Sequence, residues 1–357
     1  MFLYILRRIV LAIPVLFGIV FATFALARLI PGDPCHATLG EKATEAVCNA
    51  FMVRYGLDQP IPVQFGIYLR DALQGDLGQS FRLGLPVTRL IVERMPVTIE
   101  LALSALIFST IFGVLLGIIS AYWRNSMIDV ATMILANLGV SVPIFVLGLL
   151  LAYLFAVAFK GTALALPPSG RLTSGLKLEQ LADVWGITNA GPLKSLANFL
   201  SQMYILNGLL TLNFTLVGDA IKHLILPTLA LGTIPLSIIA RMTRASLLEV
   251  MGLDYMRTAR AKGLSERMVI FRHAMGNSLL PVVTVIGLSL GGLLGGAVLT
   301  ESIFGLTGVG KTLSDAITAR DYTVVQGFTL VIAVTFVVIN LLVDISYGYL
   351  DPRIRYD

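Results

Sequence analysis

One stretch of the chain matches the pattern with which many nucleotide-binding proteins hold phosphate. Residues 305–312 read GLTGVGKT, which fits G-x-x-x-x-G-K-[ST] at every position. In that pattern the backbone N–H groups of a glycine-rich loop surround the phosphate groups, and the lysine neutralises their charge. A working loop of this kind follows a strand and opens a helix inside an α/β domain. Whether residues 305–312 bind a nucleotide therefore depends on the elements around them.

Other residues that could do chemistry are few. The chain has three histidines, His36, His223 and His273, without an H-E-x-x-H or similar cluster, so the sequence predicts no metal site. Ser141, in Gly139-Val-Ser141, is a candidate nucleophile for an intramembrane enzyme. Such a serine needs a base beside it, and no histidine lies within the long apolar runs of the chain. We therefore expect no catalytic site.

The composition indicates a membrane protein. Hydrophobic residues make up 56% of the chain and charged residues only 13%, with a mean hydropathy of +0.85. Soluble domains carry roughly 25% charged residues, and a helix needs about 20 apolar residues to cross a bilayer. Because lipid offers no partner for backbone polar groups, apolar runs of that length form helices. The sequence predicts an all-α polytopic protein whose six transmembrane helices cover residues 9–27, 101–123, 130–159, 224–240, 278–300 and 324–343.

Two segments leave alternatives. Residues 199–217 are apolar but include Asn207 and Asn213, and we interpret them as an external amphipathic or re-entrant piece rather than a seventh span. The first run could be a signal peptide that ends at Ala25-Leu-Ala27, although its length favours a retained helix. Pro143 and Pro281 lie inside predicted spans, where they can kink or cap their helices.

Basic residues orient the spans. Arg7 and Arg8 precede the first span, residues 241–273 are strongly basic, and Arg353 and Arg355 follow the last span. Because Lys and Arg gather in cytoplasmic loops, we expect both termini in the cytoplasm. The predicted organisation comprises the N-terminus with the first helix (1–30), an external loop (31–97) and a five-helix core (98–357), which contains an external insertion (160–222) and a cytoplasmic loop (241–277).

This topology bears on the phosphate-loop match and on the cysteines. It places residues 305–312 outside the cytoplasm, between two spans that leave no room for an α/β domain, so we expect no nucleotide there. Glu301 and Asp315 flank the stretch and indicate a polar external turn. Cys35 and Cys48, the only two cysteines, both fall in the external loop, where oxidising conditions permit a disulfide. Two unpaired thiols are the alternative.

The cytoplasmic loop has the pattern of two helices joined by a turn. Asp254 is suited to the N-cap of a short helix, Gly263 to its left-handed C-cap, and Ser265 to the cap of a second helix. Ala259 and Ala261 are small, so the surface of another protein could approach this helix closely. The alternative is a basic amphipathic linker that rests on anionic lipid.

At these residues the chain resembles the membrane-spanning subunits of ABC peptide importers, most closely the first permease subunit of dipeptide permease systems. The resemblance covers nearly the whole chain. It is carried by Arg7-Arg8 with Pro14, Pro31-Gly-Asp-Pro34, Tyr55-Gly-Leu-Asp-Gln-Pro60, Gly75-Asp-Leu-Gly-Gln-Ser80, the segments 241–250, 254–264 and 280–287, Asn340-Leu-Leu-Val-Asp344 and Pro352-Arg-Ile-Arg355.

The resemblance implies the fold of a type I ABC importer permease in a bacterial inner membrane and a coupling helix in the cytoplasmic loop. In the family this loop carries the "EAA" motif and contacts an ATPase subunit; here the Glu-Ala-Ala position reads Arg257-Thr258-Ala259, without the glutamate. The implied ATPase-coupling loop consists of Asp254, Tyr255, Arg257, Thr258, Ala259, Arg260, Ala261, Lys262, Gly263 and Leu264.

The resemblance also implies partners and a substrate. The partners would be a homologous second permease subunit, two ATPase subunits that hold ATP and magnesium, an external substrate-binding protein and membrane lipid, with no nucleic acid. The chain itself would carry no cofactor. The substrate would be dipeptides or other short peptides, although relatives handle oligopeptides, glutathione, nickel or haem. A stand-alone secondary transporter is the less favoured alternative, because the span centres carry no charged residue.

Small residues near the end of the fifth predicted span indicate close helix packing. Gly291-Gly-Leu-Leu-Gly-Gly296 contains two overlapping pairs, Gly291 with Gly295 and Gly292 with Gly296. Such pairs let helices approach closely in lipid. We expect a tight contact within the chain or with another subunit here, rather than a lining of the transport path.

Overall fold

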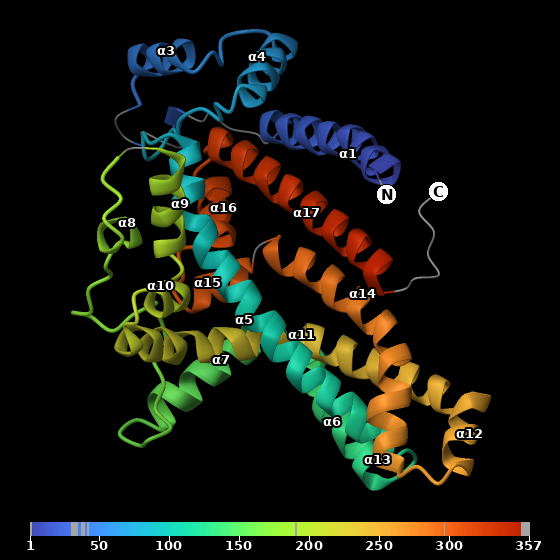
Figure 1. Cartoon of the computed structure of the whole chain (residues 1–357). Coiled ribbons are helices and arrows are strands. Elements are labelled where there is room, and N and C mark those ends of the chain that lie inside the picture. The colour runs from blue at the N-terminus through green and yellow to red at the C-terminus, as the bar shows by residue number, and fades with distance from the viewer. Residues whose placement is uncertain are drawn as a thin grey trace.

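The computed structural model describes residues 2–29, 35–36, 40, 43–189, 191–295 and 297–350 (Figure 1). Within these ranges every named element is a helix, turns and irregular segments connect the helices, and β-pairing is limited to one isolated bridge between Gln79 and Pro86. The helices are α1 (Phe2–Leu29), α3 (Glu45–Arg54), α4 (Ile61–Leu73), α5 (Val87–Tyr122), α6 (Met127–Ser141), α7 (Ile144–Tyr153), α8 (Leu181–Val184), α9 (Pro192–Ser201), α10 (Tyr204–Leu210), α11 (Phe214–Met251), α12 (Asp254–Ala261), α13 (Glu266–Met268), α14 (Met275–Leu294), α15 (Val298–Ile303), α16 (Val309–Thr318) and α17 (Tyr322–Leu350). Two π-helical segments, η2 (Leu154–Ala158) and η3 (Val269–Ala274), adjoin α7 and α14.

Five of these helices are long and apolar enough to cross a membrane, which confirms the predicted all-α polytopic fold. They cover Ile5–Leu29, Val87–Tyr122, Phe214–Met251, Glu266–Leu294 and Tyr322–Ile345. Residues 199–217 do not form a further spanning helix, because they are divided among α9, α10 and the start of α11. The fifth predicted span ends earlier than expected: α14 stops at Leu294, and α15 begins at Val298.

The third predicted span is not one straight helix. Met127–Ser141 and Ile144–Ala158 are bent by 101° at the break between them. Val142 adopts an extended conformation (φ −102°, ψ 128°) and Pro143 is the N-cap of α7. A proline lacks the N–H that would continue the helix, and it disfavours helical geometry at the residue before it. Pro281, in contrast, lies inside α14 without interrupting it.

The core of the molecule is a long contact between α5 and α11. Leu101 and Leu226 belong to one buried cluster, and Ala121 and Leu247 belong to another further along the same two helices. On the face of α5 that contacts α11, every fourth residue is buried. The glycines among these residues bring the two helix backbones close together. A Cβ atom on Gly117 would lie 2.7 Å from the carbonyl oxygen of Ala240. Sequence reasoning missed this small-residue series, which consists of Ala105, Ser109, Gly113, Gly117 and Ala121.

The glycines predicted to pack helices are only partly engaged within this chain. A Cβ atom on Gly291 would lie 2.9 Å from the ring of Phe336 on α17. A Cβ atom on Gly287, which sequence reasoning did not single out, would come even closer to Val343 of α17. A Cβ on Gly292 would have no neighbour within 4 Å among the described residues, and one on Gly295 would meet only its own helix. Gly296 lies outside the described residues.

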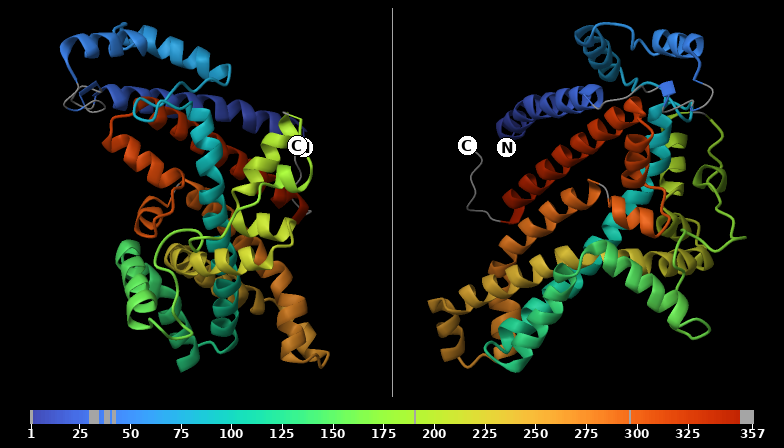
Figure 2. Two further views of the ribbon diagram at one scale, coloured as in Figure 1. Left: turned by 90° about the vertical axis from the view of Figure 1, so that its left-hand side faces the viewer. Right: turned by 180° about the vertical axis from the view of Figure 1, so that it is seen from behind.

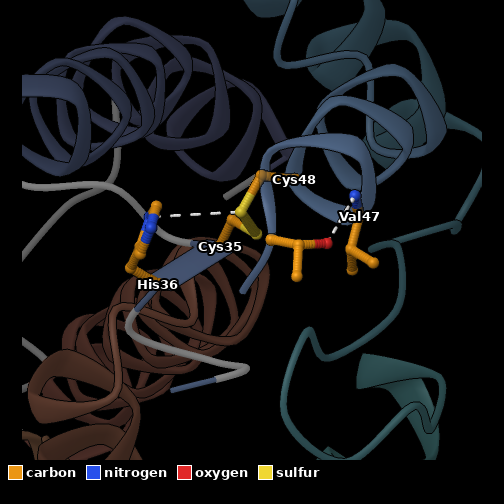
Figure 3. The surroundings of a disulfide bond; sticks show 5 residues. Cys35, His36, Val47 and Cys48 are labelled. Carbon is orange, nitrogen blue, oxygen red and sulfur yellow. Dashed lines mark hydrogen bonds between the residues drawn. A yellow bond between two sulfur atoms is a disulfide. The ribbon is translucent and has the colours of Figure 1, made fainter. Parts of the chain in front are cut away.

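The segments before α5 form a small disulfide-linked unit at one end of the molecule. Cys35 and Cys48 are joined by a disulfide, and Nδ1 of His36 lies 4.0 Å from the sulfur of Cys48 (Figure 3). Phe51 beside them stacks edge-on with Phe81, and Phe81 in turn meets the ring of Tyr322 at the start of α17. These contacts attach the unit to the helical core.

The two ends of the molecule carry different structures. Figures 1 and 2 show α3 and α4 at one end and α12 with α13 at the opposite end, with α5, α11, α14 and α17 between them. The peripheral helix α1 packs beside α17. The elements nearest each end are therefore connected only through the long helices.

Candidate functional site

The predicted coupling helix, α12, packs against the chain's own helices. Met256 and Ala259 are buried in a cluster with Leu247 and Val250 of α11 and Ile270 of η3. The helix begins at Asp254, one residue earlier than a cap at Asp254 would require. Leu253 is the N-cap and provides no side-chain hydrogen bond. The predicted N-cap role of Asp254 is therefore wrong; its carboxylate lies in the first turn, 3.2 Å from Nη1 of Arg257.

The turn after α12 is built as the sequence predicts. Gly263 has a φ of +76°, which favours glycine, and the hydroxyl of Ser265 accepts a hydrogen bond from the N–H of Met268. The turn is also fixed by side chains, because Nε of Arg260 donates to Glu266 at 2.6 Å. The second helix begins at Glu266 and runs without a gap through η3 into α14. The turn after α12 therefore leads directly into a spanning helix.

Most of the predicted coupling loop is available to a partner. Ala259 is the exception: it is 7% exposed and faces the chain's own cluster, so its small size admits neighbouring helices rather than another protein. Leu264 is partly buried against the same cluster. The exposed members are Asp254, Tyr255, Arg257, Thr258, Arg260, Ala261, Lys262 and Gly263. Four of these eight residues are aromatic or basic residues, which suit a docking face.

Above the coupling loop, one carboxylate joins three helices. Asp129 at the start of α6 is 5% exposed and accepts two hydrogen bonds from Arg244 of α11, at 2.9 and 2.8 Å. It also accepts from the hydroxyl of Ser120 on α5 and from the N–H of Asn125. Sequence reasoning missed this group, although Ser126 three residues earlier is the N-cap of α6 and marks a helix start there.

The external insertion is anchored to α5 by a second buried carboxylate. Glu100 accepts from Nη2 of Arg171 at 2.6 Å and from the N–H of Ile205 at 2.7 Å. The guanidinium of Arg171 lies over the ring of Tyr204, 3.6 Å from its centroid, and donates to the carbonyl of Gln202. The Glu100 carboxylate therefore ties two separate parts of the insertion to α5.

The GLTGVGKT stretch forms a turn followed by the start of α16. Gly305 has a φ of +64°, and Gly308 is the N-cap of α16. The carboxylate of Glu301 is fully buried and accepts from the N–H of Lys311 at 2.8 Å and from the hydroxyl of Thr98 at 2.7 Å. The same hydroxyl accepts from the N–H of Val309 at 2.8 Å. The chain's own side chains therefore occupy the first-turn N–H groups of α16.

Burial and close packing characterise this cap. Burial raises the pKa of Glu301 above its ordinary value, and the hydrogen bonds from Lys311 and Thr98 oppose the rise only in part. A Cβ atom on Gly308 would lie 2.5 Å from the Thr98 hydroxyl, and one on Gly310 would lie 2.8 Å from the backbone nitrogen of Val298. Gly308 and Gly310 thus make room for α15 and the Glu301 side chain.

These features define a class of protein. The described residues include five helices that could span a membrane, and a helix–turn–helix with exposed basic residues packs against the ends of two of them. This combination fits the membrane-embedded subunit of a transporter. Residues 113–356 match the family described as binding-protein-dependent transport system inner membrane component, and residues 1–102 match its N-terminal counterpart. The chain belongs to this family, the permease subunits of ABC importers, and is a bacterial inner membrane protein.

Individual relatives are similar along their full length. The chain is 44% identical to the dipeptide transport system permease protein DppB of Alkalihalophilus pseudofirmus, over 100% of both chains. It is 44% identical to the di/tripeptide transport system permease protein DppB of Pseudomonas aeruginosa and 43% identical to the dipeptide transport system permease protein DppB of Escherichia coli K12. Each of these two alignments covers 99% of this chain and 98% of the relative.

Proposed function

We propose that this permease carries dipeptides and other short peptides into the cell. The observation that supports this substrate class is the 43–44% identity, over essentially whole chains, to permeases that are named for dipeptide and di/tripeptide transport. The full-length match supports this substrate class, because the external loop and the insertion align with these relatives as well as the helical core.

The chain needs partner subunits in order to transport its substrate. A homologous second permease completes the path, two ATPase subunits hold ATP and magnesium, and an external binding protein delivers the peptide. The face of α14 at Gly292, which has no close neighbour among the described residues, suits the contact with the second permease. Both termini and the loop 241–277 lie in the cytoplasm, whereas residues 31–97 and 160–222 lie outside.

The motion of the ATPase subunits reaches this chain through α12. An ATPase subunit contacts the exposed face of α12, and the motion passes to α11 through the Met256 cluster and to α14 through the Arg260–Glu266 pair. The Asp129–Arg244 pair then carries it to α5 and α6. Access to the path alternates between the two sides as these helices move together.

Residues 305–312 bind no nucleotide in this proposal. An anion binds at the start of a helix because free N–H groups point toward it. At α16 the carboxylate of Glu301 and the hydroxyl of Thr98 already accept from those groups. A phosphate would have to displace a buried carboxyl group that packs against two glycines without spare room.

The coupling assignment can be tested with a matched pair of glycine substitutions. Gly263 and Gly161 have similar φ values of +76° and +81°, and a Cβ on either meets nothing within 4 Å. Gly263→Asp places a carboxylate in the proposed docking surface, so we expect dialanine uptake by the reconstituted transporter to fall by about tenfold or more. Gly161→Asp, in the external insertion, is the control and should transport normally.

The readout is dialanine uptake measured together with ATP hydrolysis in proteoliposomes. If Gly263→Asp retains coupled transport at the wild-type rate, α12 is not the docking element. If wild-type complex hydrolyses ATP but does not accumulate dialanine or trialanine, the substrate class is wrong while the coupling assignment stands.

A further inference from the structure

A cavity of about 430 Å³ lies between the outer ends of α1, α4 and α17, away from the coupling loop. Its lining includes Arg28 of α1, Tyr68 and Asp71 of α4, and Thr323 and Gln326 of α17. The loop that follows α4 closes one side with Asp76, Gly78 and Phe81. Arg28 is the second-last residue of the span Ile5–Leu29, and Gln326 lies in the first turns of the span Tyr322–Ile345. The cavity therefore lies at the membrane boundary.

Unsatisfied polar groups gather in this cavity. Among the described residues, six buried side-chain nitrogen or oxygen atoms have no hydrogen-bond partner, and three of them line this one space. They are Nη1 of Arg28, Nε2 of Gln326 and Oγ1 of Thr323. Gln326 is only 4% exposed. Because both nitrogens can only donate, and a hydroxyl can donate as well, the group that satisfies them must present oxygen acceptors.

Arg28 also lacks a counter-charge from the described part of the chain. Its Nε and Nη2 both donate to Oε1 of Gln64, at 3.2 and 3.0 Å, and its guanidinium lies 4.2 Å from the ring centroid of Phe24. These partners are neutral. Burial raises the pKa of Tyr68 to about 12, so this neighbouring phenol stays protonated and supplies no negative charge. A partly buried cation without a counter-charge favours an anionic oxygen as its remaining partner.

The rest of the lining limits which anion fits. Asp71 and Asp76 also face the cavity, and each is partly engaged: Asp71 pairs with Arg70 at 2.8 Å, and Asp76 accepts from the N–H of Gly78 at 2.8 Å. Arg54 also lines the cavity, with its guanidinium 5.5 Å from the ring centroid of Tyr55. Because the lining carries both acidic and basic side chains, it favours a ligand that has an ammonium group close to its oxyanion.

We propose that this cavity is a binding site for a zwitterionic ligand, whose oxyanion accepts from Arg28 and Gln326 while its ammonium faces Asp71 and Asp76. Two sources share this chemistry. One is the phosphoethanolamine headgroup of a membrane lipid, which the position at the membrane boundary suits. The other is a short peptide, and this source rests on the proposed transport function.

The site can be tested on the full-length chain purified in detergent with its accompanying subunits. Retention of phosphatidylethanolamine is measured by native mass spectrometry against phosphatidylglycerol, which has no ammonium, and binding of radiolabelled dialanine is measured at equilibrium. Arg28→Lys keeps the charge but loses the planar fork, and Gln326→Glu places a carboxylate beside the guanidinium. We expect each variant to bind the true ligand about tenfold more weakly. Arg89→Lys, at an exposed arginine of α5 outside this cavity, is the matched control and should bind normally.

The outcomes separate the sources. Loss of phosphatidylethanolamine in both variants, with phosphatidylglycerol weak throughout, establishes a lipid site; loss of dialanine binding in both establishes a peptide site. If neither probe binds, or if the variants and the control retain equal amounts, the cavity holds water or ordinary annular lipid and the proposal is overturned. Dialanine uptake by the wild-type transporter is measured separately, so this result does not decide the proposed function.

Discussion

The carboxyl group of Glu301 gives one external turn its shape. It accepts from Lys311 and Thr98, and through the Thr98 hydroxyl it is linked to Val309, so a side chain of α15 closes the start of α16 against α5. Gly310, one of the two glycines that make residues 305–312 match a phosphate loop, leaves space for this carboxyl group together with Gly308. A pattern defined by backbone N–H groups can thus describe an internal cap as well as a ligand site.

The pH dependence of stability should report on this group. Because burial raises the pKa of Glu301 in the folded state, folding favours the protonated carboxyl. The unfolding free energy should therefore fall, relative to a variant that does not titrate, as pH rises above the ordinary value of 4.5. Thermal unfolding of wild type and Glu301→Gln between pH 4 and 8 measures this difference. A difference that stays constant, or that grows in favour of wild type with rising pH, would contradict the assignment.

The role of an individual residue could be predicted where it depends on near neighbours in the sequence. Gly263 and Ser265 shape the backbone only within a few positions, so turn and capping preferences were sufficient to predict their roles. Asp129, Glu100 and Glu301 were not identified as anchors, because their partners lie 115, 71 and 203 residues away in the chain. The sequence of one chain contains no signal that pairs such distant residues.

Among the elements, the contact of α5 with α11 depends most on the absence of side chains. Gly113 and Gly117 place the two backbones in contact, and α5 supplies a small or short residue at each turn between them. In lipid, where apolar burial does not drive helices together, such close packing is the main attraction. The other long contact, between α14 and α17, uses Gly287 and Gly291 in the same way.

Adding one methyl group at this contact should destabilise the fold. Gly117→Ala forces a Cβ atom to within 2.6 Å of Thr243, so we expect a loss of about 1–3 kcal/mol. Gly18→Ala is the matched control, because it lies inside α1 with nothing within 4 Å and should be neutral or slightly stabilising. Thermal unfolding in detergent compares the two. Equal unfolding temperatures would show that α5 and α11 can separate slightly without cost.

Helix existence was predictable and helix continuity was not. Long apolar runs identified every spanning segment, since length and composition suffice for that purpose. Pro143 breaks its run by 101°, whereas Pro281 sits inside an unbroken helix. The two prolines have the same local chemistry, so the difference arises from the packing around them. Only the structure supplies that packing.

At the scale of the whole molecule, the disulfide-linked unit and the coupling loop lie at opposite ends (Figure 2). This arrangement matches a chain with an oxidising side and a cytoplasmic side. The charge pattern predicted the same separation from Arg7, Arg8 and the basic loop 241–277. Sequence reasoning could not predict how the insertion 160–222 folds, because its short helices are held by the distant Glu100.

Labelling with a membrane-impermeant maleimide should show both sides in one experiment. Wild type should remain unlabelled without reductant, because Cys35 and Cys48 are bonded to each other. Ala163→Cys, at an exposed residue of the insertion, should label in intact spheroplasts, and Ala261→Cys, at an exposed residue of α12, only after the membrane is opened. Labelling of wild type without reductant would rule out the disulfide. Labelling of Ala261→Cys in intact spheroplasts would reverse the topology.

The long contact of α5 with α11 has a mechanical consequence. From Leu101 to Ala121 the paired helices extend for about 30 Å, and no layer of flexible side chains separates their backbones where the glycines lie. Thr98 of α5 is hydrogen-bonded to Glu301 in the turn before α16, and Glu100 of α5 is bonded to the insertion. At the other end of the pair, α11 leads directly into α12. We therefore expect α5 and α11 to move as one rigid pair, so that a displacement at the end that carries α12 also displaces the end that carries Thr98 and Glu100. Access to the path would then change when the whole pair tilts against its neighbours.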